Sequence, residues 1–147
     1  MNLSIHEGTI EEVLAVYPLV PELTLPHGAD EYALRFEASA CHLVLVAYDG
    51  AQPVGFKVGY QRYNDGSFYS WMGGVALSYR RHYIAQQLAD AMEHWCIAKG
   101  YHSIRFKTRN RHKTMLCFAL KNGFNIMGFE PTNQVEESRI WLEKRLV

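Results

Sequence analysis

The chain has 147 residues, of which 48% are apolar and 20% are charged, and its formal net charge at pH 7 is zero. This size and apolar fraction suffice for one domain over residues 1–147 that buries its core without metals or disulfides. Three widely spaced cysteines without a CxxC pair, and no signal peptide or long apolar run, predict a cytoplasmic protein that contacts no membrane.

The chain is predicted to begin with a strand and a helix. Residues 2–6 form the short strand. Thr9 followed by Glu12 is a capping-box signature, which opens an amphipathic helix. This helix must end near Pro18, because proline interrupts helical hydrogen bonding.

A loop and a second helix are expected next. Pro21 and Pro26 mark the loop. Residues 30–40 offer apolar side chains for packing, with a less regular helical period than the first helix.

Three strands should follow as an antiparallel meander. The apolar run at 43–47 and the alternating segment at 54–60 flank Asp49-Gly50, which predicts a hairpin. Asn64-Asp65-Gly66 supplies a second turn, and residues 67–77 are the third strand.

The remaining residues indicate two helices and three strands. A helix is predicted from apolar residues at helical spacing, and it stops at Lys99-Gly100. A strand at 104–107 leads to a helix that ends at Asn122-Gly123, and strands at 124–129 and 138–146 close the chain. This order predicts an α+β fold, a mixed α/β sandwich in which the antiparallel meander leads into a β-α-β crossover.

The crossover helix is preceded by a basic turn. Residues 75–88 run from a strand through Arg80 and Arg81 into the helix, so unpaired backbone N–H groups and the positive helix end point at one spot. Residues 80–113 hold eight Lys or Arg and two acids. On charge alone a solvated surface is the simpler explanation, and a phosphorylated cofactor or a nucleic acid would also fit. Zero net charge and scattered aromatic residues argue against a nucleic-acid partner.

This segment resembles motif A of the GNAT acyltransferases, in which a strand ending in Val precedes R/Q-x-x-G-x-G/A at a helix start. Arg80, Ile84 and Ala85 match that pattern. The resemblance extends over residues 42–130 and includes Lys121-Asn122-Gly123-Phe124 at the end of the last helix.

The resemblance implies a GNAT-like fold with a splayed parallel strand pair near Val75 and Phe106, and an N-acetyltransferase that uses acetyl-CoA. The amine acceptor, a small molecule or a peptide, would attack the thioester directly, without a metal, in a monomer or a homodimer. Pantetheine would pair with the Val75 backbone, and the pyrophosphate would lie on the following turn. The cofactor-binding residues implied are Val75, Leu77, Arg80, Arg81, His82, Tyr83, Ile84, Ala85 and Asn110.

Two positions depart from the family pattern. Tyr83 replaces the first glycine of motif A, and we expect it to keep an ordinary helical φ with its ring pointing outward. Ala119 stands where many GNAT enzymes place a tyrosine acid, and residues 67–77 contain no Asp or Glu. Tyr69 and Ser70 are therefore the catalytic candidates.

Several residues keep two interpretations. Asn110 suits a coenzyme contact or a helix N-cap, and His82 suits a phosphate contact or a solvated turn. Trp71 suits an acceptor pocket or, preferably, the core. Gly73-Gly74 suits a position where a helix packs closely or, preferably, a β-bulge that separates the parallel strands.

The function itself also keeps alternatives. The acid excess before residue 80 suggests a cationic amine acceptor. The departures at Tyr83 and Ala119 leave a non-catalytic acyl-CoA-binding or regulatory module as the alternative function.

Overall fold

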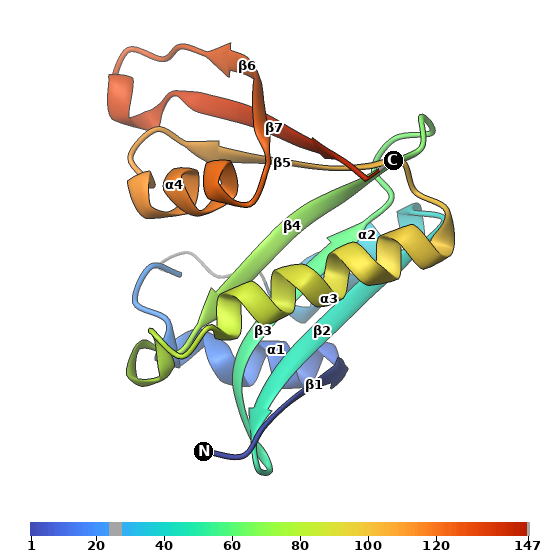
Figure 1. Cartoon of the computed structure of the whole chain (residues 1–147), viewed down its shortest axis with the longest axis vertical. Coiled ribbons are helices and arrows are strands. Elements are labelled where there is room, and N and C mark those ends of the chain that lie inside the picture. Colours follow the sequence, from blue (N-terminus) through green and yellow to red (C-terminus); the bar gives the residue numbers. More distant parts are fainter. Residues whose placement is uncertain (24–27, 147) are drawn as a thin grey trace.

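The computed structural model describes residues 1–23 and 28–146, and within them a single mixed sheet organises the molecule (Figure 1). The sheet order is β1-β2-β3-β4-β5-β7-β6. Pro26, one of the two prolines that mark the predicted loop, lies outside the described residues. The elements are β1 (Leu3–Glu7), α1 (Ile10–Val16), α2 (Ala29–Ala38), β2 (His42–Asp49), β3 (Gln52–Tyr60), β4 (Ser67–Val75), α3 (Ile84–Lys99), β5 (Ser103–Arg109), α4 (Lys113–Lys121), β6 (Asn125–Glu130) and β7 (Arg139–Arg145).

Local signals position the start of α1 and the end of α3 as the sequence predicts. Thr9 and Glu12 form the capping box of α1, and the chain continues past Val16 into a 3₁₀ turn that contains Pro18. Gly100 ends α3 in the left-handed conformation, with φ of 89°.

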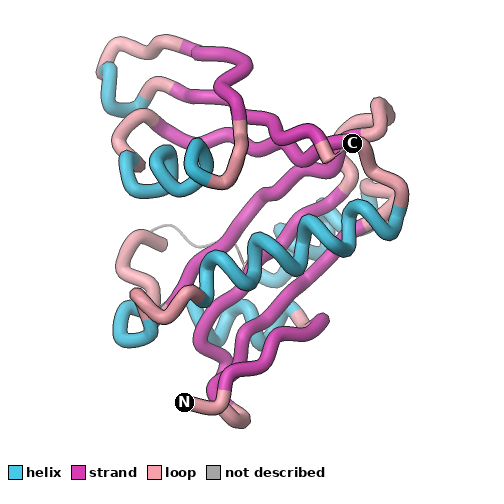
Figure 2. Tube along the Cα trace, in the orientation of Figure 1, coloured by secondary structure: helices cyan, strands magenta, loops and turns pink. Residues whose placement is uncertain are grey.

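The helices cover both faces of the sheet (Figures 1 and 2). α1 and α2 pack on one face against side chains such as Val46 and Phe56, and α3 packs on the other against Leu45 and Val54. α4 packs on Phe106, which lies two residues beyond the α3-facing Ile104, so α4 is on the α3 face. No helix among the described residues has the length and apolarity to cross a membrane.

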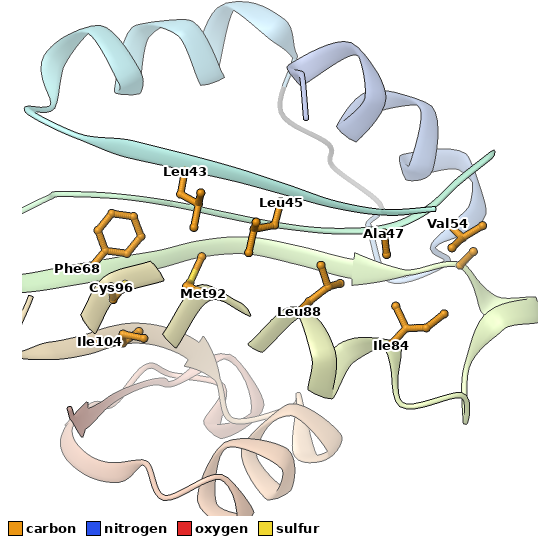
Figure 3. Packing of buried hydrophobic residues seen from close by; sticks show 11 residues of the cluster. Leu43, Leu45, Ala47, Val54, Phe68, Ile84, Leu88, Met92, Cys96 and Ile104 are labelled. Carbon is orange, nitrogen blue, oxygen red and sulfur yellow. The ribbon is translucent and has the colours of Figure 1, made fainter. Parts of the chain in front are cut away.

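The N-terminal end of α3 is fixed by the core. Ile84, Leu88 and Met92 are at most 2% exposed and point from α3 toward the strands (Figure 3). Burial of each such side chain contributes about 1.5–3 kcal/mol. The turn before Ile84 is therefore held close to the end of β4.

β4 and β5 separate after a short parallel contact. They pair only over Ser67–Tyr69 and Ser103–Arg105, after which β4 continues along β3 and β5 continues along β7 (Figure 2). The sheet thus opens between the two strands, which confirms the splayed parallel pair.

A bulge lies on β4 where the strands part. Ser70 is opposite Gly59 and Met72 is opposite Val58, so Trp71 is the extra residue on β4. The prediction of a bulge at Gly73-Gly74 is wrong by two residues. Those glycines pair regularly with Lys57 and Phe56.

Candidate active site

The opened edge of β4 presents backbone polar groups that β5 does not use. Ala76 N donates to Val54 O at 2.8 Å, so its backbone faces β3. Because successive residues of a strand point their backbone groups to alternate sides, those of Val75 and Gly73 face the opening. Val75 O accepts a hydrogen bond from Arg80 Nε at 3.2 Å, and its second lone pair remains available.

The turn between β4 and α3 gathers backbone N–H groups. Arg81 and Tyr83 have φ of 67° and 61°, and the first amide to enter the helical ladder is Gln87 N, which donates to Tyr83 O at 3.0 Å. No amide from 81 to 86 donates to a backbone carbonyl of the described residues. Amides in such alternating conformations form a concave nest that binds anions, here at the positive end of a 16-residue helix.

Tyr83 does not have the conformation expected from the sequence. Its φ is 61° rather than helical, because the nest requires a left-handed residue immediately before Ile84. The expected direction of the ring is confirmed, since Tyr83 is 80% exposed. The amide remains accessible, and the residue bears the conformational strain that a glycine would avoid.

The other residues implied in coenzyme binding surround the nest. Arg81, His82 and Ala85 are exposed, and Leu77 is exposed on the short 3₁₀ turn Leu77–Tyr79. Ile84 offers only its amide, because its side chain is buried.

Arg80 is engaged by an acid from the segment after α1. Its Nη1 and Nη2 atoms donate to Glu22 Oε2 and Oε1 at 2.7 and 2.5 Å. These bonds from Arg80 are the main reason that the pKa of Glu22 lies below its usual value.

Asn110 is not a helix N-cap. α4 begins at Lys113, preceded by His112, and Asn110 N donates to Ser138 O at 2.8 Å. Asn110 Nδ2 also donates to Val135 O at 3.3 Å, so this residue ties the end of β5 to the β6–β7 connection.

A pocket of about 350 Å³ lies where β4 and β5 part. Its lining combines aromatic and basic side chains from β4, β5, β7, α2 and the loops before β4 and α4. These are Arg35, Arg62, Tyr69, Trp71, Met72, Lys107, Thr108, Arg109, His112 and Arg139.

Comparison with known proteins identifies the family. Residues 10–124 match the family model described as the acetyltransferase (GNAT) family. The chain belongs to this family. No curated protein sequence gives a significant match.

Solved GNAT structures share the fold over the whole chain. Ard1 from Thermoplasma volcanium has a TM-score of 0.83 at 19% identity, covering 100% of this chain and 99% of its own. The ribosomal-protein-S18-alanine N-acetyltransferase from Escherichia coli has a TM-score of 0.81 at 13% identity, and the match covers 98% of this chain and 94% of that enzyme. A putative streptothricin acetyltransferase from Bacillus anthracis, in complex with acetyl coenzyme A, has a TM-score of 0.78 at 18% identity, and the match covers 99% of each chain.

The two catalytic candidates of this GNAT chain lie on opposite faces of β4. Tyr69 lines the pocket, and its burial raises the pKa of the phenol to about 12. Ser70 pairs with Gly59, whose Cβ position faces Phe68 and Met92, so it belongs to the α3 face and does not line the pocket. Trp71 fits both interpretations, because it lines the pocket and packs on Tyr32 with ring centroids 4.8 Å apart.

His112 is a pocket residue that the sequence did not single out. Burial, followed by the charge of Arg111, lowers the pKa of its imidazole. The ring is therefore neutral at pH 7 and can accept a proton. The assignment of the helix start to Asn110 placed His112 inside a helix and hid its position at the pocket.

Among the described residues no group of three or more His, Cys, Asp or Glu is placed to hold a metal ion. The pocket lining offers hydrogen-bonding groups and positive charge, and His112 is its imidazole.

Proposed function

We propose that the protein transfers an acetyl group from acetyl-CoA to an amine, by direct attack of the amine on the thioester. The observation that carries this proposal is the alignment of two features at one opening of the sheet. The amides of residues 81–86 are free at the start of α3. From this turn, the unpaired edge of β4 at Gly73 and Val75 runs toward the pocket.

The chemistry of acetyl-CoA fits these groups. Its pyrophosphate needs several N–H donors and positive charge. The amides of 81–86 and the imidazole of His82 offer donors, and the side chain of Arg81 offers charge. Pantetheine is an extended chain with amide groups, so it can pair with Val75 as an added strand would. Asn110 and Leu77 are the remaining contacts that this proposal assigns to the coenzyme.

His112 and Tyr69 are suited to different parts of the proton transfer. An amine is mostly protonated at pH 7, and neutral His112 can take its proton before attack. Tyr69, with a pKa of about 12, keeps its proton and can donate a hydrogen bond to the departing sulfur. Binding both reactants in one geometry supplies the rest of the rate enhancement.

A discontinuous assay of free CoA thiol tests this function. Purified protein is incubated with acetyl-CoA and a panel of polyamines, amino acids and peptides, and thiol release is measured against acceptor-free controls. The proposal predicts acceptor-dependent release with the acetylated amine as the second product. It is wrong if no acceptor raises the rate although acetyl-CoA binds.

That last outcome would favour a non-catalytic acyl-CoA-binding module. The observation in its favour is Ala119, which is 2% exposed on α4 and packs on Ile140 and Leu142, so no hydroxyl reaches the opening from this position.

Two further properties remain predictions. We propose a cytoplasmic location, supported by the free state of Cys41, Cys96 and Cys117, because reducing compartments keep thiols unpaired.

Homodimer formation is supported by β6, an edge strand with exposed Met127 and Phe129. Light scattering coupled to gel filtration measures the oligomeric state directly.

A further inference from the structure

The pocket at the β4–β5 opening has a pronounced excess of positive charge. Its cations are Arg35, Arg62, Lys107, Arg109 and Arg139, and no Asp or Glu lines it. Two of them have acidic partners: Arg35 Nε lies 2.9 Å from Glu31 Oε1, and Arg109 Nε lies 3.7 Å from Glu137 Oε2. The other three cations form no ion pair with a carboxylate of residues 1–23 or 28–146.

Aromatic rings hold two of the unpaired cations at the pocket. The guanidinium carbon of Arg62 lies 4.8 Å from the ring centroid of Tyr69, and Lys107 Nζ lies 5.3 Å from that of Trp141. Cation–π contacts of this kind orient a positive group without neutralising it. Trp141 in turn donates to Glu130 Oε1 at 3.1 Å, and Glu130 makes no ion pair with Lys107.

The cations also repel one another. Arg109 and Arg139 are direct cross-strand partners on β5 and β7, an arrangement that destabilises a sheet. Burial is the main cause that lowers the pKa of Lys107, and the charges of Arg139 and Arg62 lower it further. An anion bound in the pocket would offset both the burial and the repulsion.

These charges do not belong to the coenzyme site proposed above. Tyr69 and Lys107 lie on the sheet face that α1 and α2 cover, whereas the nest precedes α3 on the opposite face. Trp71 and Val75 are also separated by several residues along β4.

We propose that the acceptor is an amine that carries carboxylates within a few bonds of its nucleophilic nitrogen. The proposal rests on the acetyl transfer proposed above and specifies its acceptor. Arg62, Lys107 and Arg139 bind the carboxylates, and the amine is thereby directed toward the thioester. A cavity of about 350 Å³ accommodates a free amino dicarboxylate or the first residue of an acidic peptide.

The acceptor carboxylates take no part in the bond changes. The amine nitrogen forms a bond to the thioester carbon while the bond from carbon to sulfur breaks. His112 accepts the ammonium proton before attack, and the second proton that the nitrogen loses passes to the departing sulfur. The products are an N-acetyl amine and the CoA thiol.

This acceptor class replaces the cationic amine suggested by the acid excess of the first half of the chain. None of the acids that motivated that suggestion lines the pocket. Glu22 binds Arg80, and Asp65 Oδ2 lies 2.9 Å from Arg105 Nη1. Neither lines the pocket.

Matched acceptors and variants test the proposal. Thiol release is measured with L-glutamate and L-aspartate, with their amides L-glutamine and L-asparagine, with spermidine, and with dipeptides that begin with Asp or Asn. The variants are Arg62→Gln and Arg139→Gln, with Arg145→Gln as the control. Arg145 lies on the same face of β7 as Arg139, six residues away. Calorimetry measures acetyl-CoA affinity for each variant.

The expected result is at least a tenfold higher kcat/KM for the carboxylate-bearing amine than for its amide. Arg62→Gln and Arg139→Gln should raise the KM for that acceptor at least fivefold and leave acetyl-CoA affinity unchanged, and Arg145→Gln should change neither. A higher kcat/KM for dipeptides that begin with Asp than for free aspartate identifies the acceptor as a peptide. A higher kcat/KM for free aspartate identifies it as a small molecule.

Turnover of spermidine or of the uncharged amides at equal or higher kcat/KM overturns the inference and leaves acetyl transfer standing. Absence of turnover with every carboxylate-bearing amine overturns it as well. Failure to bind acetyl-CoA in the calorimeter contradicts the proposed function itself.

Discussion

Arg80 joins Glu22 to the end of β4: its two terminal nitrogens bind the carboxylate at 2.7 and 2.5 Å, and its Nε binds Val75 O at 3.2 Å. The pair is partly exposed, so it contributes about 0–1 kcal/mol to stability. The Arg80–Glu22 pair lies beside the nest, so its effect on ligand binding should exceed its effect on stability. The reason is that Glu22 competes with a phosphate for the guanidinium of Arg80.

Removal of that competitor should strengthen coenzyme binding. Glu22→Gln is expected to raise acetyl-CoA affinity two- to tenfold in calorimetry and to change the free energy of unfolding by less than about 1 kcal/mol. Glu37→Gln is the matched control, because Glu37 is exposed on α2. A loss of affinity in Glu22→Gln alone would mean that the acid positions Arg80 for binding.

Tyr83→Gly should stabilise the protein and retain or tighten acetyl-CoA binding. The φ of 61° costs a residue with a side chain about 1 kcal/mol relative to glycine. Thermal unfolding should show a higher Tm for the glycine variant. Tyr83→Ala separates the two roles, since it removes the ring and keeps the strain; a large loss of affinity in both variants would show that the ring itself contacts the coenzyme.

Lys57→Met should stabilise the protein at pH 7 by about 1–3 kcal/mol. Lys57 forms no ion pair among the described residues, and burial lowers the pKa of its amine from 10.5 to about 8. The gain should be less than the full shift implies, because the side chain remains partly exposed.

The pH dependence of this gain has a defined sign. Between pH 8 and 10.5 the unfolded chain binds more protons than the folded one at Lys57, so the stability of the original protein rises with pH in that window. The advantage of Lys57→Met is therefore largest below pH 8 and shrinks toward pH 10.5. Lys57→Arg keeps the charge and should show no gain. Urea unfolding at pH 7, 9 and 10 measures these differences, and equal gains at all three values would contradict the account.

His112→Gln should lower kcat by about 10²–10⁴ if the imidazole accepts the amine proton. Because the pKa of His112 lies below its ordinary value of 6.5, kcat of the original enzyme should fall only at pH values below 6.5, where the ring becomes protonated. The variant should lose this acid limb. His94→Gln, at an exposed position of α3, is the control. An unchanged kcat–pH profile in His112→Gln would remove it from the mechanism.

The elements were predictable because their signals are local. The capping box of Thr9 and Glu12 and the glycine at 100 act within one helical turn of their helices, and the structure confirms both. The bulge at Trp71 depends instead on the register of β4 against β3, which no local pattern encodes. The left-handed Tyr83 was missed because the geometry of the nest overrides the preference of a tyrosine for negative φ.

The pocket was beyond sequence reasoning for a related reason. Arg35, Arg62, Lys107 and Arg139 come from α2, a loop, β5 and β7, and their separation in sequence conceals their common location. The overall excess of acids before residue 80 suggested a cationic acceptor, but none of those acids lines the pocket.

Titration of ¹⁵N-labelled protein with acetyl-CoA tests the central claim most directly. The account predicts saturable chemical-shift changes in the amides of residues 81–86 and of Val75, with small changes at Arg145. An absence of saturable shifts at these amides, at coenzyme concentrations that support thiol release or exceed them, would contradict the proposed mode of coenzyme binding.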